Sequence, residues 1–211
     1  FECVKTNIVG AMNLIDACID QGVKKVVALS TDKASSPINL YGATKLASDK
    51  LFIASNSSYA GGHKTSFSVV RYGNVMGSRG SVIPFFMSAK DKGTLLITDE
   101  RMTRFMISLD QGVDLVWNAF NDMIGGEIYV KKIPSMKVID IARTIAPNAK
   151  HKIIGMRPGE KLHEEMISKE DSYSTYEYTR HYKILPQINE WSKDVKRIKD
   201  GKKVPEGFFY N

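Results

Sequence analysis

The chain has 211 residues, of which 43% are hydrophobic and 25% are charged, and its formal net charge is +7. This is the balance of a globular protein with one domain or one and a half. No apolar run approaches the roughly 20 residues that span a bilayer, and no secretory signal is visible, so we expect a cytoplasmic protein. Cys3 and Cys18 lie too far apart on one predicted helix to pair, and the histidines lack metal-ligand spacing.

The first third of the chain alternates between predicted helices and strands. A helix is expected over residues 7–21, because Ile8, Met12, Ile15 and Ile19 form an apolar stripe. A strand over residues 25–30, a helix over about 39–57 and a strand over 65–72 follow. This order with short links is typical of a parallel sheet with crossover helices. The sequence begins without Met inside a helical pattern, so we expect a partial sequence.

The rest of the chain gives shorter predicted elements. Ser108-Leu109-Asp110-Gln111 is a capping-box pattern that opens a helix. Trp117 and Phe120 of that helix, with Val113 and Val116, are expected in the core rather than against a cofactor. The other expected elements are a helix over 82–90, strands over 94–98, 127–130 and 151–155, a helix capped by Ser135 and ended by Pro147, and a short helix from Glu160 to Met166. The tyrosine-rich segment from Ser168 predicts either a strap around the domain or an oligomer contact.

The first predicted strand brings three polar side chains to its carboxyl end. Thr31, Asp32 and Lys33 follow it directly, and open α/β sheets place ligands at this edge. Tyr41 and Lys45 are four residues apart at the start of the next helix, so phenol and ammonium can share one helix face. A nearby ammonium lowers the pKa of a tyrosine, which is one way to make it a general base.

Two further segments invite a binding interpretation. Gly73, Gly77 and Gly80 follow a strand, but their spacing is not the Gly-x-Gly-x2-Gly of a dinucleotide fingerprint. We therefore favour a substrate loop over a cofactor loop there. The basic segment over residues 193–203 lacks interleaved aromatics, so a solvated face is favoured over a nucleic-acid site.

These motifs occur in the order typical of one family. Tyr41-x3-Lys45, after a strand ending in Ser30-Thr31, resembles the extended, nucleotide-sugar branch of the short-chain dehydrogenase/reductase superfamily. The Asp32-Lys33 pair is similar to that of the inverting UDP-N-acetylglucosamine 4,6-dehydratases, because retaining dehydratases carry Asp-Glu there and 4-epimerases lack the pair. Three further matching segments are Arg71-Tyr72-Gly73-Asn74-Val75-Met76-Gly77, Met102-Thr103-Arg104-Phe105 and Arg157-Pro158-Gly159-Glu160-Lys161.

The resemblance implies an α/β fold, an NAD(P)-binding Rossmann-like doubly wound parallel sheet with a small α/β substrate-binding domain. The family's Thr-Gly-x2-Gly-x2-Gly fingerprint is not found in this sequence, so only the C-terminal half of the Rossmann domain is expected. Roughly one mononucleotide-binding half would be absent. The expected domains are residues 1–80 as the C-terminal part of the Rossmann domain, 81–190 mainly as a nucleotide-sugar subdomain with strands returning to the sheet, and 191–211 as a basic tail.

The resemblance also implies a role for each motif residue. Tyr41 would remove the 4-hydroxyl proton of the sugar, Thr31 would act with it by a hydrogen bond to the 4-oxygen, and Lys45 would hold the nicotinamide ribose. Lys33 would take the proton from C5, and Asp32 would help the C6 hydroxyl leave as water. The implied cofactor contacts are Tyr41, Lys45, Tyr72, Asn74 and Val75. The implied substrate contacts are Thr31, Asn74, Val82, Ile83, Pro84, Arg104, Arg157 and Glu160.

The implied function is the dehydration of UDP-N-acetylglucosamine with inversion at C5, by an NADP-dependent hydro-lyase with NAD as the alternative cofactor. The product would be a UDP-4-keto-6-deoxy-L-hexosamine for bacterial surface glycan or flagellin glycosylation. The alternatives are a retaining dehydratase, a 4-epimerase, or an inactive nucleotide-sugar-binding module, since the fingerprint is missing. The expected partners are UDP-N-acetylglucosamine and further copies in a homo-oligomer, with no nucleic acid, membrane or metal.

Overall fold

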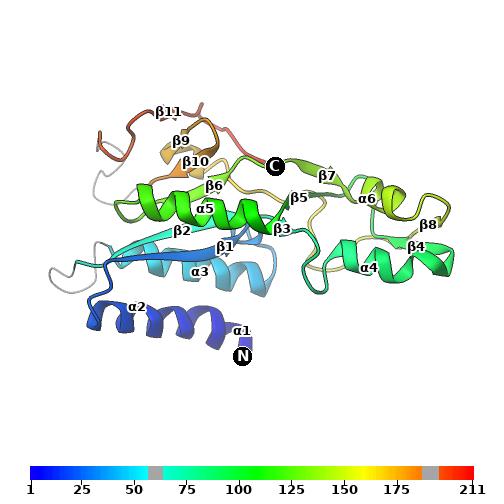
Figure 1. Cartoon of the computed structure of the whole chain (residues 1–211), viewed down its shortest axis with the longest axis horizontal. Helices are drawn as coiled ribbons and strands as arrows, with labels where there is room; N and C mark the ends of the chain where they lie inside the picture. The colour runs from blue at the N-terminus through cyan, green and yellow to red at the C-terminus, as the bar shows by residue number, and fades with distance from the viewer. Residues whose placement is uncertain (57–63, 187–194) are drawn as a thin grey trace. The chain divides into compact units, whose positions relative to one another are not determined.

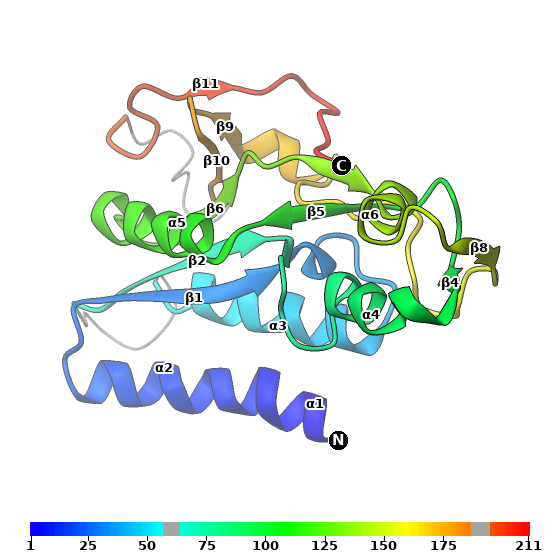
Figure 2. The ribbon, with the colours of Figure 1, turned by 45° about the vertical axis from the view of Figure 1, so that its right-hand side comes forward.

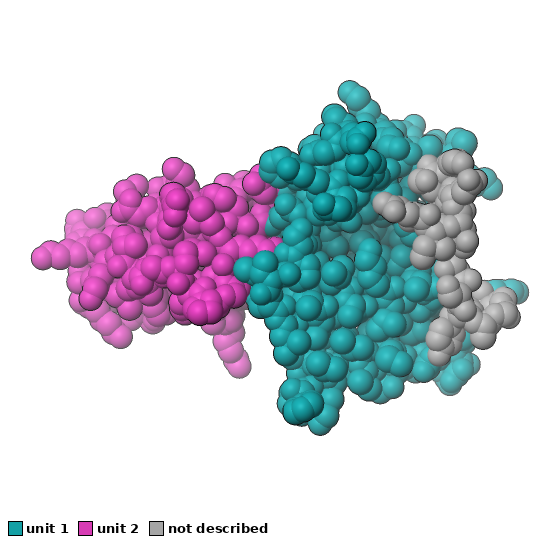
Figure 3. Space-filling view, turned by 180° about the vertical axis from the view of Figure 1, so that it is seen from behind, with its two compact units in different colours: residues 1–72, 113–132, 165–210 teal, residues 73–112, 133–164, 211 magenta. Residues whose placement is uncertain are grey.

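The computed structural model describes residues 1–56, 64–186 and 195–211 (Figure 1). These residues form two compact units, which Figure 3 colours teal and magenta. Unit 1 takes its described residues from 1–72, 113–132 and 165–210. Unit 2 takes them from 73–112, 133–164 and 211. The chain returns to unit 1 twice, through residues 113–132 and 165–210.

Unit 1 is built on a six-stranded sheet of order β1-β2-β6-β10-β9-β11. The first three strands are parallel to one another, and β10, β9 and β11 run antiparallel to their neighbours. Helices α2 and α3 cover one face and α5 covers the other (Figures 1 and 2), which confirms the predicted α/β class. The elements are α1 (Glu2–Val4), η1 (Lys5–Val9), α2 (Gly10–Asp20), β1 (Lys25–Thr31), η2 (Asp32–Ala34), α3 (Leu40–Ala54), β2 (Ser66–Tyr72), α5 (Leu109–Asp122, which begins in unit 2), β6 (Ile128–Lys131), η4 (Asp171–Ser174), β9 (Thr175–Glu177), β10 (His181–Ile184) and β11 (Lys202–Lys203).

The alternation of β2 divides the core of unit 1 between the two faces of the sheet. Phe67 lies 6.0 Å from Phe52 of α3, centroid to centroid, whereas Val70 packs with Leu115 of α5 and with Met123, the residue that follows this helix. Successive side chains of a strand point to opposite faces, so both helical layers are anchored by one strand. The register of β1 and β2 then sets Thr31 beside Tyr72, at the carboxyl edge where the sequence predicted a site.

Unit 2 is a smaller α/β body. It has one sheet of order β3-β5-β7 and a parallel pair of β4 with β8. Its core is apolar and joins Phe86 of α4, Leu95 and Ile97 of β4 and Val138 and Ala142 of α6. The elements are β3 (Asn74–Val75), α4 (Val82–Ala89), η3 (Lys90–Lys92), β4 (Thr94–Ile97), β5 (Thr103–Ile107), β7 (Ser135–Lys137), α6 (Val138–Ile145) and β8 (Lys150–Ile153).

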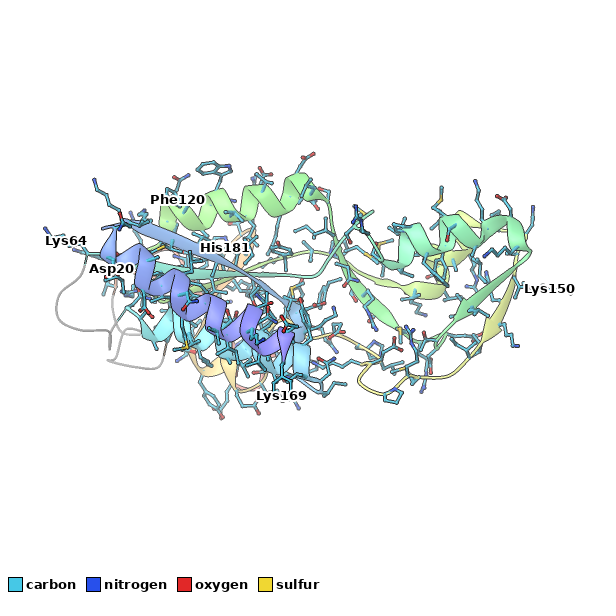
Figure 4. The ribbon with its side chains drawn as sticks, turned by 90° about the horizontal axis from the view of Figure 1, so that it is seen from below. Asp20, Lys64, Phe120, Lys150, Lys169 and His181 are labelled. Carbon is cyan, nitrogen blue, oxygen red and sulfur yellow. The ribbon has the colours of Figure 1, made fainter. Side chains whose placement is uncertain are left out.

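The prediction that Trp117 and Phe120 of α5 lie in the core is wrong. Trp117 is 60% exposed and Phe120, labelled in Figure 4, is 38% exposed. The buried positions are instead Leu115, Ala119 and Met123. They also follow a helical spacing of four residues, so the helix carries two apolar stripes. The smaller stripe packs against the sheet, and the aromatic one faces outward in the described structure.

Four other expectations can be compared directly with the structure. The capping box is confirmed, because Ser108 N donates to Gln111 Oε1 at 3.1 Å and Gln111 N donates to Ser108 Oγ at 3.2 Å. Ser135 does not cap a helix, since it begins β7, and α6 starts only after Lys137. The short helix expected up to Met166 is replaced by turns. Met12, predicted on an apolar stripe, is exposed at 47%.

The tyrosine-rich segment packs on unit 1, as one of the two options above expected. It contributes β9 and β10 to the large sheet. Part of the predicted basic tail is also ordered here, because Lys202 and Lys203 pair with β9 and Arg197 is buried. Residues 191–194 of that tail lie outside the described residues. In the described part of the chain, every helix is too short or too polar to cross a bilayer.

Candidate functional site

The end of β1 gathers three polar side chains into one cluster. Thr31 is the last residue of the strand, and its Oγ1 accepts the N–H of Lys33 at 3.4 Å, which starts the turn η2. Its hydroxyl donates to Asp32 Oδ1 at 2.8 Å, and Lys33 Nζ donates to the same oxygen at 3.0 Å. Asp32 is fully buried, and its Oδ2 has no hydrogen-bond partner among the described residues. The predicted acid and base are therefore in direct contact.

The first turn of α3 packs directly on this cluster. Asn39 caps the helix by accepting the N–H of Gly42 at 2.8 Å. A Cβ on Gly42 would lie 2.3 Å from the Lys33 carbonyl oxygen, so only glycine allows this approach. Tyr41, the neighbour of Gly42, is 45% exposed. The close packing holds the backbone that carries the phenol against the backbone that carries the acid and base.

Lys45 and Tyr72 occupy the same end of unit 1. Lys45 Nζ donates to the backbone carbonyl of Leu29 at 2.7 Å, on the strand that leads into the cluster. The pKa of Tyr72 is raised, first by burial and then by the neighbouring Tyr41 phenol. The structure therefore brings together the five predicted catalytic residues and one predicted cofactor contact.

Unit 2 contains a cavity of about 370 Å³, a size that suits a small ligand. Five of the predicted contacts line it, namely Asn74, Val82, Arg104, Arg157 and Glu160. Ile83 and Pro84 are on the same helix as Val82 but are not lining residues of this cavity. Val75 is also absent from the lining.

Backbone geometry brings the polar lining residues to one cavity. Gly73 lets the chain approach β5 closely, because a Cβ there would lie 2.4 Å from Phe105 Cβ. The next residue, Asn74, is thereby aligned with Met106, two positions after Arg104. Asn74 Oδ1 is buried without a hydrogen-bond partner among the described residues. Such an orphaned acceptor is costly unless a ligand or solvent donor reaches it.

The two arginines of the cavity are held differently. Arg104 Nη1 donates to the carbonyl of Thr103 at 2.6 Å and to that of Leu162 at 3.3 Å, so its guanidinium is fixed by backbone. Arg157 donates to Glu160 Oε1 from Nε at 3.0 Å and from Nη2 at 2.5 Å, although its side chain is 69% exposed. Planar guanidinium groups suit bidentate contacts with phosphate oxygens. The cavity therefore has the donors that an anionic group needs.

Sequence reasoning missed the apolar wall of this cavity. The wall is formed by Phe85 and Phe86 of α4, Leu96 of β4 and Ile154. The available signal was the alternation of β4, in which Leu95 is buried and Leu96 is 44% exposed. Two consecutive leucines in a short strand cannot both face the same core, and the exposed one was a candidate lining residue.

Comparisons with known proteins give the family to which the chain is similar. The profile of a family described as polysaccharide biosynthesis protein matches residues 1–186. A UDP-N-acetylglucosamine 4,6-dehydratase (inverting) from Campylobacter jejuni serotype O:2 is 58% identical over 217 residues, covering 100% of this chain and 65% of that protein. A UDP-glucose 4-epimerase from Rickettsia akari is 43% identical over 188 residues, covering 87% of this chain and 55% of that one.

A solved structure supports the same fold. The X-ray structure of Pen from Bacillus thuringiensis matches with a TM-score of 0.89 and 38% identity, covering 100% of this chain and 64% of that one. A dTDP-glucose 4,6-dehydratase from Streptomyces venezuelae, at 23% identity and a TM-score of 0.68, shares the fold. The chain thus spans less than two thirds of the length of these relatives.

Proposed function

This chain belongs to the polysaccharide biosynthesis protein family, and we propose that it dehydrates UDP-N-acetylglucosamine between C4 and C6 with inversion at C5. The observation that carries the proposal is the contact of Lys33 Nζ with Asp32 Oδ1 at 3.0 Å, at the end of β1. Removal of hydrogen at C4 needs one base. Elimination of the C6 hydroxyl needs in addition a base for C5 and an acid for the departing oxygen.

The Lys33–Asp32 contact suits an elimination because one proton serves both groups. When this proton moves from the Lys33 ammonium to the Asp32 carboxylate, Lys33 becomes an amine base and Asp32 becomes a carboxylic acid. The amine can then take the C5 proton, which is acidic once C4 is a ketone, while the acid protonates the C6 hydroxyl as it leaves. Thr31 Oγ1 donates to the same Asp32 oxygen as Lys33, so that oxygen is held in place for the transfer.

Tyr41 is proposed as the base for the first step. Its exposed phenol would take the proton of the sugar 4-hydroxyl, and Lys45 would stabilise the phenolate through its positive charge. Inversion at C5 then requires that the proton return to the opposite face of the sugar from which Lys33 removed it.

The polar heads of Tyr41 and Lys45 also fit the nicotinamide ribose of a dinucleotide. Tyr41 is 45% exposed, and Lys45 Nζ is bound at an exposed backbone carbonyl, so a ligand can reach both. Tyr72, Asn74 and Val75 are the further proposed contacts. NADP, our choice over NAD, would supply a hydride carrier for oxidation at C4 and reduction at C6.

Unit 2 would supply the contacts to UDP. Arg104 and Arg157 provide guanidinium donors for the diphosphate, and Asn74 provides an unpartnered polar side chain. Glu160 would accept from the ribose hydroxyls, which requires that it share or release its bond to Arg157. The backbone at Val82, Ile83 and Pro84 is proposed to hold the uracil ring.

The test is turnover of UDP-N-acetylglucosamine with NADP in heavy water, followed by NMR of the product. A 4-keto sugar with deuterium at C5 and the inverted configuration is expected. Deuterium at C5 with the original configuration would indicate a retaining dehydratase, and a C4 epimer without loss of water would indicate a 4-epimerase. Lys33→Met should abolish exchange at C5, whereas Lys50→Met, an exposed lysine on α3, should leave it unchanged.

A further inference from the structure

A buried arginine lies on the strand next to the one that ends at the proposed acid/base cluster. Arg71, on β2, is 2% exposed. Its Nη1 donates to the carbonyl of Met166 at 2.8 Å and lies 3.4 Å from Asp171 Oδ2, and its Nη2 lies 3.5 Å from Asp49 Oδ2. Asp49 in turn accepts the hydroxyl of Ser30 at 2.8 Å. We call these four side chains, Ser30, Asp49, Arg71 and Asp171, the Arg71 cluster.

Three members of the Arg71 cluster, Ser30, Asp49 and Arg71, are close in sequence to residues of the proposed active site. Ser30 immediately precedes Thr31 on β1. Arg71, the register partner of Ser30, immediately precedes Tyr72 on β2. Asp49 lies on α3, four residues after Lys45 and eight after Tyr41, so the three share one side of the helix. One cation therefore joins the two strand ends and the helix that carry the proposed chemistry.

Stability alone is a weak reason for such a cluster. Burial raises the pKa of Asp49, against the lowering effects of Arg71, Ser30 and Lys45. Taking charges out of water is costly, and a buried ion pair can often be replaced by apolar residues without loss of stability. The charged groups instead constrain geometry. A planar guanidinium that donates to three acceptors allows only one arrangement of the elements that carry those acceptors.

We propose that Arg71 is a positioning residue: through Asp49 and Ser30 it fixes α3 against the ends of β1 and β2 and so holds Tyr41 and Lys45 in register with Thr31, Asp32 and Lys33. The inference rests on the proposed function for its catalytic consequence, whereas the positional part concerns the fold of unit 1 alone. The rival explanation is that the cluster only stabilises the core.

The decisive variant is the double substitution Arg71→Met with Asp49→Asn. It removes one charge of each sign, keeps an acceptor for Ser30 and leaves Asp171, whose side chain is 23% exposed, to the solvent. We expect a thermal unfolding midpoint near that of the wild type. We also expect kcat to fall at least about tenfold, because small displacements of reacting groups are costly. KM for the UDP-sugar should be unchanged, since the proposed diphosphate contacts belong to unit 2.

A matched control is available in the same unit. Arg197 is buried and its Nη1 lies 2.8 Å from Glu127 Oε1, but this pair carries none of the proposed catalytic residues. Arg197→Met with Glu127→Gln should leave kcat unchanged in the fraction that is folded. A similar fall of kcat in both double variants would overturn the proposal in favour of a general role in the core.

An NMR measurement without substrate separates this inference from the proposed function. In the Arg71/Asp49 double variant, the amide resonances of Thr31–Lys33 and Tyr41–Lys45 should shift, while those of residues that line the unit 2 cavity should stay in place. If the double variant does not fold, Arg71→Lys is measured instead, with the same expectation. Unshifted resonances in a folded variant would refute the positioning role. Shifted resonances in a chain whose wild type shows no turnover would support the positioning role and reject the proposed function.

Discussion

Gly42 offers the sharpest test of how the proposed site is held together. Glycine inside a helix costs about 1 kcal/mol relative to alanine, so Gly42→Ala should stabilise α3 if packing did not intervene. The structure predicts the opposite outcome. A Cβ at this position would lie 2.3 Å from the carbonyl oxygen of Lys33 and 3.0 Å from Pro37 Cβ. The first of these contacts is with backbone, which cannot rotate away.

The size of the effect follows from that distance. Ordinary contact begins at 3.4 Å, so α3 and η2 must separate by roughly 1 Å, which is the scale of overpacking that costs about 1–3 kcal/mol. After the gain in helix propensity, we expect a net loss of about 0–2 kcal/mol in the free energy of unfolding. The same displacement moves Tyr41 away from Lys33, and a shift of about 1 Å can cost on the order of a hundredfold in rate.

Denaturant unfolding and turnover, measured on the same preparations, test this expectation. The matched control is Gly112→Ala in α5, where a Cβ would meet nothing within 4 Å. That variant should gain up to about 1 kcal/mol and keep full activity. A Gly42→Ala variant that gains as much stability as the control and turns over at the wild-type rate would refute the packing of α3 on η2. If the chain shows no turnover, shifted amide resonances of Asp32 and Lys33 serve as the readout.

Three further outcomes are expected. Asp99 has its pKa lowered to about 2 by the hydrogen bonds from Arg101, so its contribution to stability is present above pH 3.8 and lost as the pH falls toward 2. Arg101→Met removes the side-chain donors but keeps the backbone N–H donor, so an NMR titration should show the pKa of Asp99 rising toward 3.8. Arg104→Met should weaken binding of UDP at least about tenfold by calorimetry, whereas Arg101→Met, on an exposed turn, should not. Leu115→Ala should cost about 2–5 kcal/mol in unfolding free energy, and Trp117→Ala less than about 1 kcal/mol, because only Leu115 is buried.

The carboxyl edge of β1 could be predicted because its signals are local. A β-branched run marks the strand, Thr31 caps the turn that follows, and Asn39 caps the next helix. Each of these signals acts within a few residues of the chain. The positions of Asp32, Lys33 and Tyr41 at one edge then follow from the rule that parallel strands point their carboxyl ends the same way.

The side of α5 that is buried against the sheet could not be predicted in the same way. Two apolar stripes run along the helix, one through Leu115 and Ala119 and the other through Val113 and Trp117. Periodicity measures the spacing of apolar residues but says nothing about which stripe meets a partner. The choice depends on the sheet surface, where Ala119 packs in one cluster with Val70 of β2 and Tyr129 of β6. Aromatic side chains bury the most area, so the stripe with Trp117 was expected in the core, and this expectation was wrong.

The short strands of unit 2 were missed for a related reason. β3 and β7 have two and three residues, too few to show an alternation, and they exist because β5 lies between them to supply their hydrogen bonds. Their pairing nonetheless decides the cavity, since it aligns Asn74 with Met106 and so brings it near Arg104. The motif residues could be named from the sequence, but their convergence depends on contacts between segments about thirty residues apart.

The Arg71 cluster shows the same limit in its strongest form. Arg71 stands in an apolar strand and Asp49 in a helix, 22 residues apart, with Asp171 100 residues from Arg71. Alone, each resembles an ordinary charged residue at the surface, where such residues mostly lie. The sequence nevertheless held one clue. Arg71 follows Phe67 by four residues on the same strand, so its side chain points to the same face as Phe67, which is the face that α3 covers. A cation forced into that position needs acceptors, and the acceptors of this one come from the elements that carry the proposed acid, base and tyrosine.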